Sequence, residues 1–318
     1  MKAIIIYEPG GPEQFKLAEY PIPVPASGEV LVRIKARGLN RSELMTRKGY
    51  SPGVHFPRVL GIECVGEVVT DPSGKLQPGQ QVAACMGEMG RAYDGSYAEY
   101  AVLPAGILQP FTSHLPWKIL GALPEMYQTV YGSLFAALDI RQGETLLIRG
   151  GTSSIGLLAI QMAKNAGLKV IATTRNPAKE NFLLSNGCDQ VLIDDGHLQQ
   201  RIPAAVDKVL ELIGTNTLKD SLACARRGGT VCMTGILSES WSIPSFTPME
   251  FIPPAVKLTV CNSGEIKSDA ATFSAFIRDV EQGKIKIITG PVFQLDQISQ
   301  AHQLMDDNQA MGKIVVVS

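Results

Sequence analysis

Residues that build metal sites and disulfides are scarce in this sequence. The 318 residues include only four histidines and six cysteines, and no two cysteines form a C-x-x-C pair. This spacing excludes a zinc ribbon and a disulfide framework. We therefore expect free, mostly buried thiols in a reducing compartment.

Long apolar runs and an imbalance of charge are also missing. No run reaches the roughly 18–20 apolar residues that span a bilayer, and the run that begins at Ala3 is too short for the core of a signal peptide. The net charge of −1 gives no general attraction to nucleic acid or anionic membranes. A hydrophobic content of 45% supplies core for two globular domains. We predict a cytoplasmic protein without nucleic-acid or membrane partners.

Residues 1 to about 115 have the pattern of β-structure. Ala3–Tyr7 and Phe15–Tyr20 are short apolar segments, and Glu29–Leu39 alternates apolar and charged side chains like a half-buried antiparallel strand. Gly61–Thr70 and Gly95–Pro104 are further long strands. Curved strands joined by Gly/Pro turns favour a small barrel.

Strands and helices alternate from about Leu120 onward. After a helix over Ala122–Ala137, six strands with intervening crossovers predict a doubly wound parallel sheet. The expected strands are Thr145–Ile148, Lys169–Thr173, Gln190–Ile193, Lys208–Leu212, Thr230–Met233 and Lys257–Val260. The helices Ala270–Gln282 and Gln297–Asn308 and the strand Lys313–Val317 do not extend this pattern, so we expect them to return to the first domain.

One stretch, Arg149–Gly156 with the sequence RGGTSSIG, joins a buried strand to a helix. A tight glycine turn before a helix N-terminus is the geometry that binds the pyrophosphate of a dinucleotide. The fingerprint G-x-G-x-x-G predicts glycines at 151, 153 and 156, but position 153 is serine. We interpret Ser153 and Ser154 as hydroxyl donors added to the backbone N–H groups, with Ile155 beside them.

The end of the second strand of this sheet distinguishes NAD from NADP, because an NAD site places a carboxylate there. This chain has none, and instead carries Thr174 and Arg175, with Lys179 one helical turn on. A guanidinium matches a phosphate dianion better than a ribose diol, so we favour NADPH. The alternative is a surface arginine after a strand.

Two later strands end in glycine, at Gly214 and Gly235. Ligands lie at the carboxyl edge of such sheets, where a glycine lets the backbone approach the cofactor. Ordinary strand-to-loop turns are the alternative.

Several motifs recur in a specific order along the whole chain. They are PASGEVLVRIKARGLNRSEL (Pro25–Leu44), RVLGIECVGEVV (Arg58–Val69), LQPGQQV, GSYAEYAVLP, the glycine loop with its helix (Thr145–Gly167), RRGGTVCMTG (Arg226–Gly235) and GKIVVV (Gly312–Val317). In this order they resemble the medium-chain dehydrogenase/reductase superfamily, specifically its zinc-independent quinone oxidoreductase branch. The resemblance implies a GroES-like β-barrel catalytic domain, residues 1–118 and 264–318, plus a Rossmann domain, residues 119–263, with the active site in the cleft between them.

Differences between this chain and the zinc-dependent members of the same superfamily indicate whether it binds zinc. Those enzymes carry Cys where this chain has Asn40 and His where it has Ile62. Neither an amide nor an alkyl group replaces the lost ligand. The lobe with four clustered cysteines is also missing, so the resemblance implies no metal.

The resemblance further implies roles for individual residues. Asn40 is expected beside the nicotinamide and substrate, and Thr129 at the nicotinamide ribose or phosphate. Tyr50 is the candidate donor to the substrate oxygen, with packing on the cleft wall as the alternative. Lys313 is expected to reach the cofactor, with a surface lysine as the alternative.

Together these features predict an NADPH-dependent reductase of quinones or α,β-unsaturated carbonyl compounds. Hydride transfer to an electrophilic acceptor needs less assistance than zinc-dependent alcohol oxidation. The alternatives are an enoyl-thioester reductase of the same superfamily and a cofactor-binding scaffold protein without turnover. The family commonly dimerises through the last strand of the Rossmann sheet, so we expect a homodimer.

Overall fold

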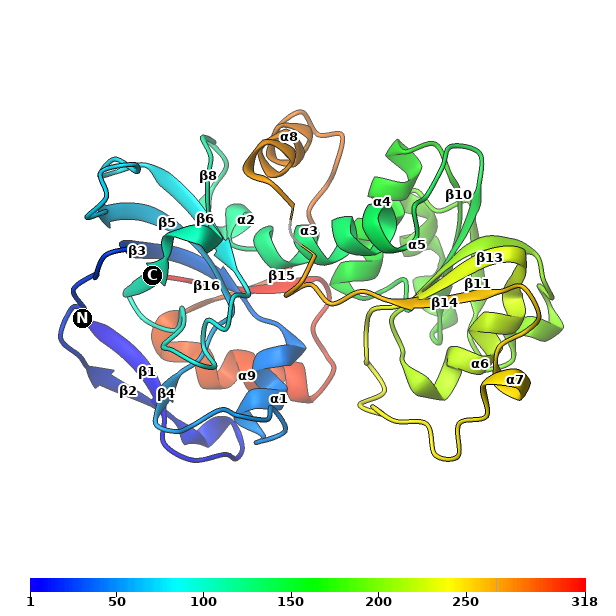
Figure 1. The fold of residues 1–318 in the computed structure, drawn as a ribbon, viewed down its shortest axis with the longest axis horizontal. Helices are drawn as coiled ribbons and strands as arrows, with labels where there is room; N and C mark the ends of the chain where they lie inside the picture. Colours follow the sequence, from blue (N-terminus) through cyan, green and yellow to red (C-terminus); the bar gives the residue numbers. More distant parts are fainter. Residues whose placement is uncertain (267) are drawn as a thin grey trace. The chain divides into compact units, whose positions relative to one another are not determined.

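The computed structural model, which describes residues 1–266 and 268–318, separates the chain into two units (Figure 1). Unit 1 consists of Met1–Tyr127 and Asp269–Ser318, and unit 2 is the intervening segment Gln128–Ser268. The first border between these units falls inside helix α3 (Pro124–Tyr131), whereas the sequence predicts a domain border at residues 118/119. A continuous helix carries no turn signal, which is why the sequence pattern does not locate this border.

Unit 1 is built on two sheets whose strands are mostly antiparallel. The larger has the order β15-β16-β3-β5-β6-β8, with β7 also paired to β3, and the smaller has the order β2-β1-β4. The β15-β16 pair of the larger sheet is parallel. The strands are β1 (Lys2–Ile6), β2 (Phe15–Glu19), β3 (Glu29–Gly38), β4 (Arg58–Val59), β5 (Glu63–Thr70), β6 (Gln81–Cys85), β7 (Tyr100–Pro104), β8 (Leu108–Pro110), β15 (Thr289–Gln294) and β16 (Lys313–Val317). As predicted, β16 from the C-terminal segment completes this unit, where it pairs with β3.

Four helices accompany these strands, and two of them are absent from the sequence-based prediction. They are α1 (Arg41–Arg47), α2 (Trp117–Leu120), α8 (Ala270–Glu281) and α9 (Ile298–Asp306). The short helices α1 and α2 lack a long apolar period, so the pattern did not reveal them. The predicted strand Gly95–Pro104 is also too long, because only β7 is regular. The backbone N–H groups of Gly95 and Tyr97 donate instead to Val59 and Leu60.

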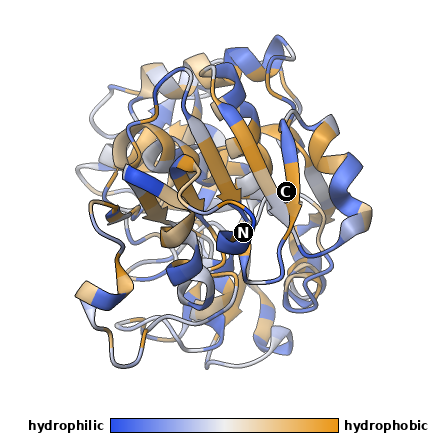
Figure 2. Ribbon diagram, turned by 90° about the vertical axis from the view of Figure 1, so that its right-hand side faces the viewer, coloured by the Kyte–Doolittle hydropathy of each residue, from blue (hydrophilic) through white to orange (hydrophobic). Residues whose placement is uncertain are grey.

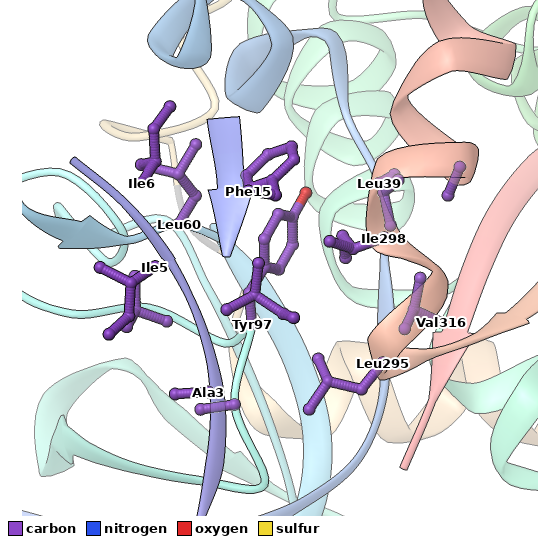
Figure 3. Packing of buried hydrophobic residues seen from close by; sticks show 14 of the residues in the cluster. Ala3, Ile5, Ile6, Phe15, Leu39, Leu60, Tyr97, Leu295, Ile298 and Val316 are labelled. Carbon is purple, nitrogen blue, oxygen red and sulfur yellow. The ribbon is translucent and has the colours of Figure 1, made fainter. Parts of the chain in front are cut away.

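An apolar cluster packs the two ends of the chain together in unit 1 (Figure 3). Phe15 and Tyr97 lie in its centre, with their ring centroids 6.0 Å apart. Ile298 from α9 and Val316 from β16 pack in the same cluster. The C-terminal segment is therefore part of the core of unit 1.

Unit 2 contains the predicted six-stranded parallel sheet, with the order β11-β10-β9-β12-β13-β14. Two sets of three strands extend in opposite directions from its centre, which is the doubly wound Rossmann arrangement. The strands are β9 (Thr145–Arg149), β10 (Lys169–Thr174), β11 (Gln190–Ile193), β12 (Val206–Glu211), β13 (Ala225–Met233) and β14 (Lys257–Val260). Strand β13 begins at Ala225, earlier than the predicted Thr230.

The helices of unit 2 are short and flank this sheet. They are α4 (Ser154–Asn165), α5 (Glu180–Ser185), α6 (Thr215–Cys224) and α7 (Pro248–Phe251), and α3 continues into the π-helical turn η3 (Gly132–Ala137). Figure 2 shows mostly hydrophobic strands and helices with hydrophilic segments on their outer sides. In the described part of the chain the six cysteines form no disulfide, and no helix there is long and apolar enough to cross a membrane.

Candidate functional site

The glycine loop of unit 2 connects β9 to α4 and is closed by Ser153. The Ser153 hydroxyl donates to the Gly150 carbonyl at 2.8 Å and accepts from the Gly156 N–H at 3.0 Å, so Ser153 is the N-cap of α4. Its hydrogen is committed within the loop, which differs from the expected role as an added phosphate donor. What Ser153 contributes in this structure is the shape of the turn.

The same loop lies tightly against its neighbours. A Cβ at Gly156 would lie 2.5 Å from the Gly150 carbonyl oxygen, and one at Gly151 would lie 2.9 Å from the Ala172 Cβ. Among the described residues, no partner is found for the backbone N–H groups of Ser154 and Ile155, the first two residues of α4. Such N–H groups at a helix start form an anion-binding surface.

The end of β10 presents positive charge. Thr174 is buried, and its hydroxyl accepts from the Asn176 N–H at 3.1 Å. Arg175 is exposed and Lys179 half-buried, and neither forms an ion pair with any residue that the structure describes. The edge predicted to receive a 2′-phosphate therefore carries two uncommitted cations.

The ends of β12 and β13 are shaped by their own chain. Buried Glu211 accepts from the N–H groups of Ile213 at 2.7 Å and Gly214 at 3.1 Å, and Gly214 has φ +118°. A Cβ at Gly235 would lie 2.5 Å from the Leu212 carbonyl oxygen. The local backbone thus requires both glycines, independently of any cofactor beside them.

Thr129 is buried in α3 close to the end of β14. Its carbonyl accepts from the Ser133 hydroxyl at 2.7 Å and lies 3.9 Å from the Cys261 Sγ. The helix is therefore fixed at this point to the edge of the sheet.

Unit 1 contains a separate cluster of buried ionisable groups around Asn40, the residue that precedes α1. The Asn40 Nδ2 donates to Glu63 Oε1 at 2.9 Å and contacts Glu43 Oε1 at 3.4 Å. The Lys313 Nζ donates to the Asn40 Oδ1 and lies 2.7 Å from Glu63 Oε1 and 3.6 Å from Glu125 Oε2. The Asn40 amide is therefore bonded at both ends within unit 1.

Lys313 is only 2% exposed, which rules out the surface lysine considered as an alternative. Burial lowers its pKa, but the carboxylates of Glu63 and Glu125 outweigh that effect and raise it. The pKa of Glu43 is raised to about 8, first by burial and second by the charge of Glu63. One buried cation thus faces two fully buried carboxyl groups, and Glu43 holds the remaining proton at neutral pH.

The donor chemistry of this cluster does not fit a zinc ion. Glu63 Oε1 already contacts the amide of Asn40 and the ammonium of Lys313. The alkyl side chain of Ile62 offers no ligand atom. An ammonium group beside the carboxylate repels a second cation. Within residues 1–266 and 268–318, no group of three His, Cys, Asp or Glu side chains has a metal-binding arrangement.

Tyr50 lies in the loop after α1 with 68% of its surface exposed. Its backbone N–H donates to Met45 at 2.9 Å, and its hydroxyl has no partner in the described part of the chain. The phenol is therefore available as a donor.

Sequence reasoning did not identify a second buried cluster, which surrounds Arg149 at the end of β9. This fully buried guanidinium contacts Asp194 and Asp220, each at 2.7 Å. Arginine at the end of an otherwise apolar strand was a visible signal, since a buried charge requires partners.

Two family models match the chain. Residues 26–113 match the alcohol dehydrogenase GroES-like domain, and residues 154–279 match the zinc-binding dehydrogenase domain. The chain is 27% identical over 332 residues to quinone oxidoreductase of Mus musculus, covering 100% of this chain and 98% of the relative. It is also 27% identical over 340 residues to acryloyl-coenzyme A reductase of Sulfurisphaera tokodaii, covering 99% of each. The structure of Escherichia coli quinone oxidoreductase complexed with NADPH superposes with a TM-score of 0.88 over 100% of both chains, at 22% identity.

Proposed function

Since the chain belongs to the medium-chain dehydrogenase/reductase superfamily, in its quinone oxidoreductase-like branch, we propose that it is an NADPH-dependent reductase of quinones or α,β-unsaturated carbonyl compounds and works without zinc. The observation that carries this proposal is that the glycine loop and two cations lie at the ends of neighbouring strands, β9 and β10. The cations, Arg175 and Lys179, form no ion pair with the described residues. The name of the murine relative supports a quinone as the acceptor.

The residues of unit 2 fit the cofactor in the following way. Ser154 and Ile155 offer N–H groups to the pyrophosphate, while Gly151 and Gly156 let the loop lie close to α4 and β10. Thr174, Arg175 and Lys179 surround the 2′-phosphate. Thr129, Gly214 and Gly235 border the nicotinamide half of the cofactor. Bound there, the cofactor supplies a hydride to the acceptor.

Unit 1 carries the residues to which this proposal assigns roles toward the acceptor. Tyr50 donates a hydrogen bond to the carbonyl oxygen as negative charge develops there. Asn40 is held in one orientation by Glu63 and Lys313, so it presents a fixed surface beside the acceptor. Lys313 acts as a positioning residue for Asn40. The proposed assembly is a cytoplasmic homodimer.

Acceptor specificity is tested by comparing 9,10-phenanthrenequinone with crotonyl-CoA as substrates of the purified protein and NADPH. Reduction of the quinone with no reduction of the thioester supports the proposal. The reverse result identifies an enoyl-thioester reductase, the second candidate, which the name of the Sulfurisphaera tokodaii relative favours. If neither is reduced while NADPH still raises the melting temperature, the protein is a cofactor-binding scaffold. Stoichiometric zinc by metal analysis contradicts the zinc-free part of the proposal.

Arg175→Ala should weaken NADPH binding by roughly 10- to 100-fold, because a charge-assisted hydrogen bond contributes about 1.5–3 kcal/mol. NADH, which lacks the 2′-phosphate, should lose less than about threefold. Fluorescence titration of both cofactors measures the difference. Arg226→Ala is the matched control, because this exposed arginine pairs with Asp207 elsewhere in unit 2. Equal losses for NADPH and NADH contradict the 2′-phosphate assignment.

A further inference from the structure

Arg149 joins the glycine loop to the end of β11 through a bidentate ion pair. Its Nε and Nη2 donate to the two carboxylate oxygens of Asp194, both at 2.7 Å. Its Nη1 donates to Asp220 at 2.7 Å and to the Ser221 hydroxyl at 3.1 Å, both in α6. Each of the three nitrogen atoms of this guanidinium therefore has a partner, and the arginine itself is 0% exposed.

Asp194 lies directly beside the strand end that carries the cations. Its N–H donates to the Thr174 carbonyl at 2.8 Å, and its carboxylate accepts from the Thr173 hydroxyl at 3.4 Å. That hydroxyl in turn accepts from the Gly150 N–H at 3.1 Å. A carboxylate thus borders the place where the proposed cofactor carries its 2′-phosphate.

Asp194 is ionised in this buried position because Arg149 stabilises its carboxylate. Burial raises its pKa, but the hydrogen bonds and charge of Arg149 reverse that effect and hold the pKa below its usual range. The next residue, Asp195, is paired with Arg201 at 2.8 Å in an exposed position. Each carboxylate that follows β11 is therefore matched by an arginine, while Arg175 and Lys179 have no such partner among the described residues.

We propose that the buried Arg149–Asp194 pair is a selectivity element of the cofactor site, which cancels the carboxylate charge at the end of β11 and so lets this edge accept a 2′-phosphate. The inference rests on the proposed NADPH site. Arg149 acts through Asp194 and not by contact with the cofactor, so it is a positioning residue. A charge left uncancelled near the phosphate disfavours NADPH while leaving NADH almost unaffected.

The test is a set of variants whose dissociation constants for NADPH and NADH are measured by fluorescence titration, together with melting temperatures without cofactor. Arg149→Met should raise the ratio of the NADPH constant to the NADH constant by about tenfold. Arg149→Met combined with Asp194→Asn should return this ratio to within about twofold of wild type. Arg149→Lys, which keeps the charge, should preserve the ratio even where it lowers the melting temperature. Arg201→Met, at the exposed pair, should change the ratio less than about twofold.

A purely structural role for Arg149 predicts a different result. Equal losses for NADPH and NADH in Arg149→Met, or no recovery of the ratio in the double variant, overturn the inference. If Arg149→Met does not fold, Asp194→Asn alone decides, because it removes the carboxylate charge at the end of β11 while Arg149 keeps its ion pair with Asp220. The ratio should then shift toward NADPH by about threefold or more, and an unchanged ratio overturns the inference. A wild-type preference for NADH refutes the NADPH site itself before any variant is compared.

Discussion

Replacing Lys313 with methionine is expected to lower the free energy of unfolding of unit 1 by about 3–5 kcal/mol, because it leaves buried Glu63 without its counter-ion. Lys313 and Glu63 are 2% and 0% exposed, so water does not reach the carboxylate to compensate. The Asn40 Oδ1 also loses its donor.

Differential scanning calorimetry measures this effect as a fall in the melting temperature of about 10 °C. Lys35→Met is the matched control, because Lys35 pairs with Glu67 at 3.0 Å on the surface of the same unit. Its loss should be within about 1 kcal/mol. Adding Glu63→Gln to Lys313→Met should recover part of the stability, since no buried charge is then left unpaired. A melting temperature equal to wild type for Lys313→Met contradicts the ion-pair interpretation.

The second large effect is a pH dependence that Glu43→Gln should remove. The pKa of Glu43 is about 8 in the folded protein and about 4.5 when unfolded. A raised pKa in the folded state means that Glu43 contributes fully to stability below pH 4.5 and loses that contribution as the pH rises to 8. The total loss is at most about 4–5 kcal/mol, at 1.36 kcal/mol per pKa unit. Glutamine does not titrate, so the variant should become more stable than wild type at alkaline pH.

The measurement is the difference in unfolding free energy between Glu43→Gln and wild type from pH 5 to pH 9. Taking this difference removes the contribution of His302. Burial, and after it the charge of Arg47, lowers the pKa of this histidine to about 3. That histidine has the opposite dependence, because its contribution falls as the pH falls from 6.5 toward 3. Glu67→Gln, at the surface pair with Lys35, is the control. A difference that stays constant with pH refutes the assignment of the proton to Glu43.

Periodicity was sufficient to predict the parallel sheet of unit 2, because fully buried strands such as β9 are continuous apolar runs between glycine turns. The glycine loop could be interpreted from its surroundings, since a buried strand precedes it and an apolar helix follows it. The role of Ser153 was less accessible. Whether a hydroxyl points into the loop or out of it depends on where the Gly150 carbonyl lies, which no local pattern specifies.

Contacts between distant segments were the part that sequence reasoning missed. Glu43, Glu63 and Lys313 meet because β16 pairs with β3 and the end of β3 leads into α1. Arg149 meets Asp194 and Asp220 across three elements of unit 2. In each case the sequence shows a charged residue within an apolar stretch but does not name its partner. A charge in such a position therefore predicts a network without predicting its members.

Strand β16 has a consequence for how the protein is made. It lies between β15 and β3 within the seven-stranded sheet and carries Lys313 into the ionic cluster. During synthesis, unit 1 cannot complete its sheet or neutralise Glu63 until residue 317 has left the ribosome, whereas the continuous segment of unit 2 emerges earlier. We therefore expect unit 2 to fold first, while residues 36–38 of β3 remain without their β16 partner until that strand is synthesised.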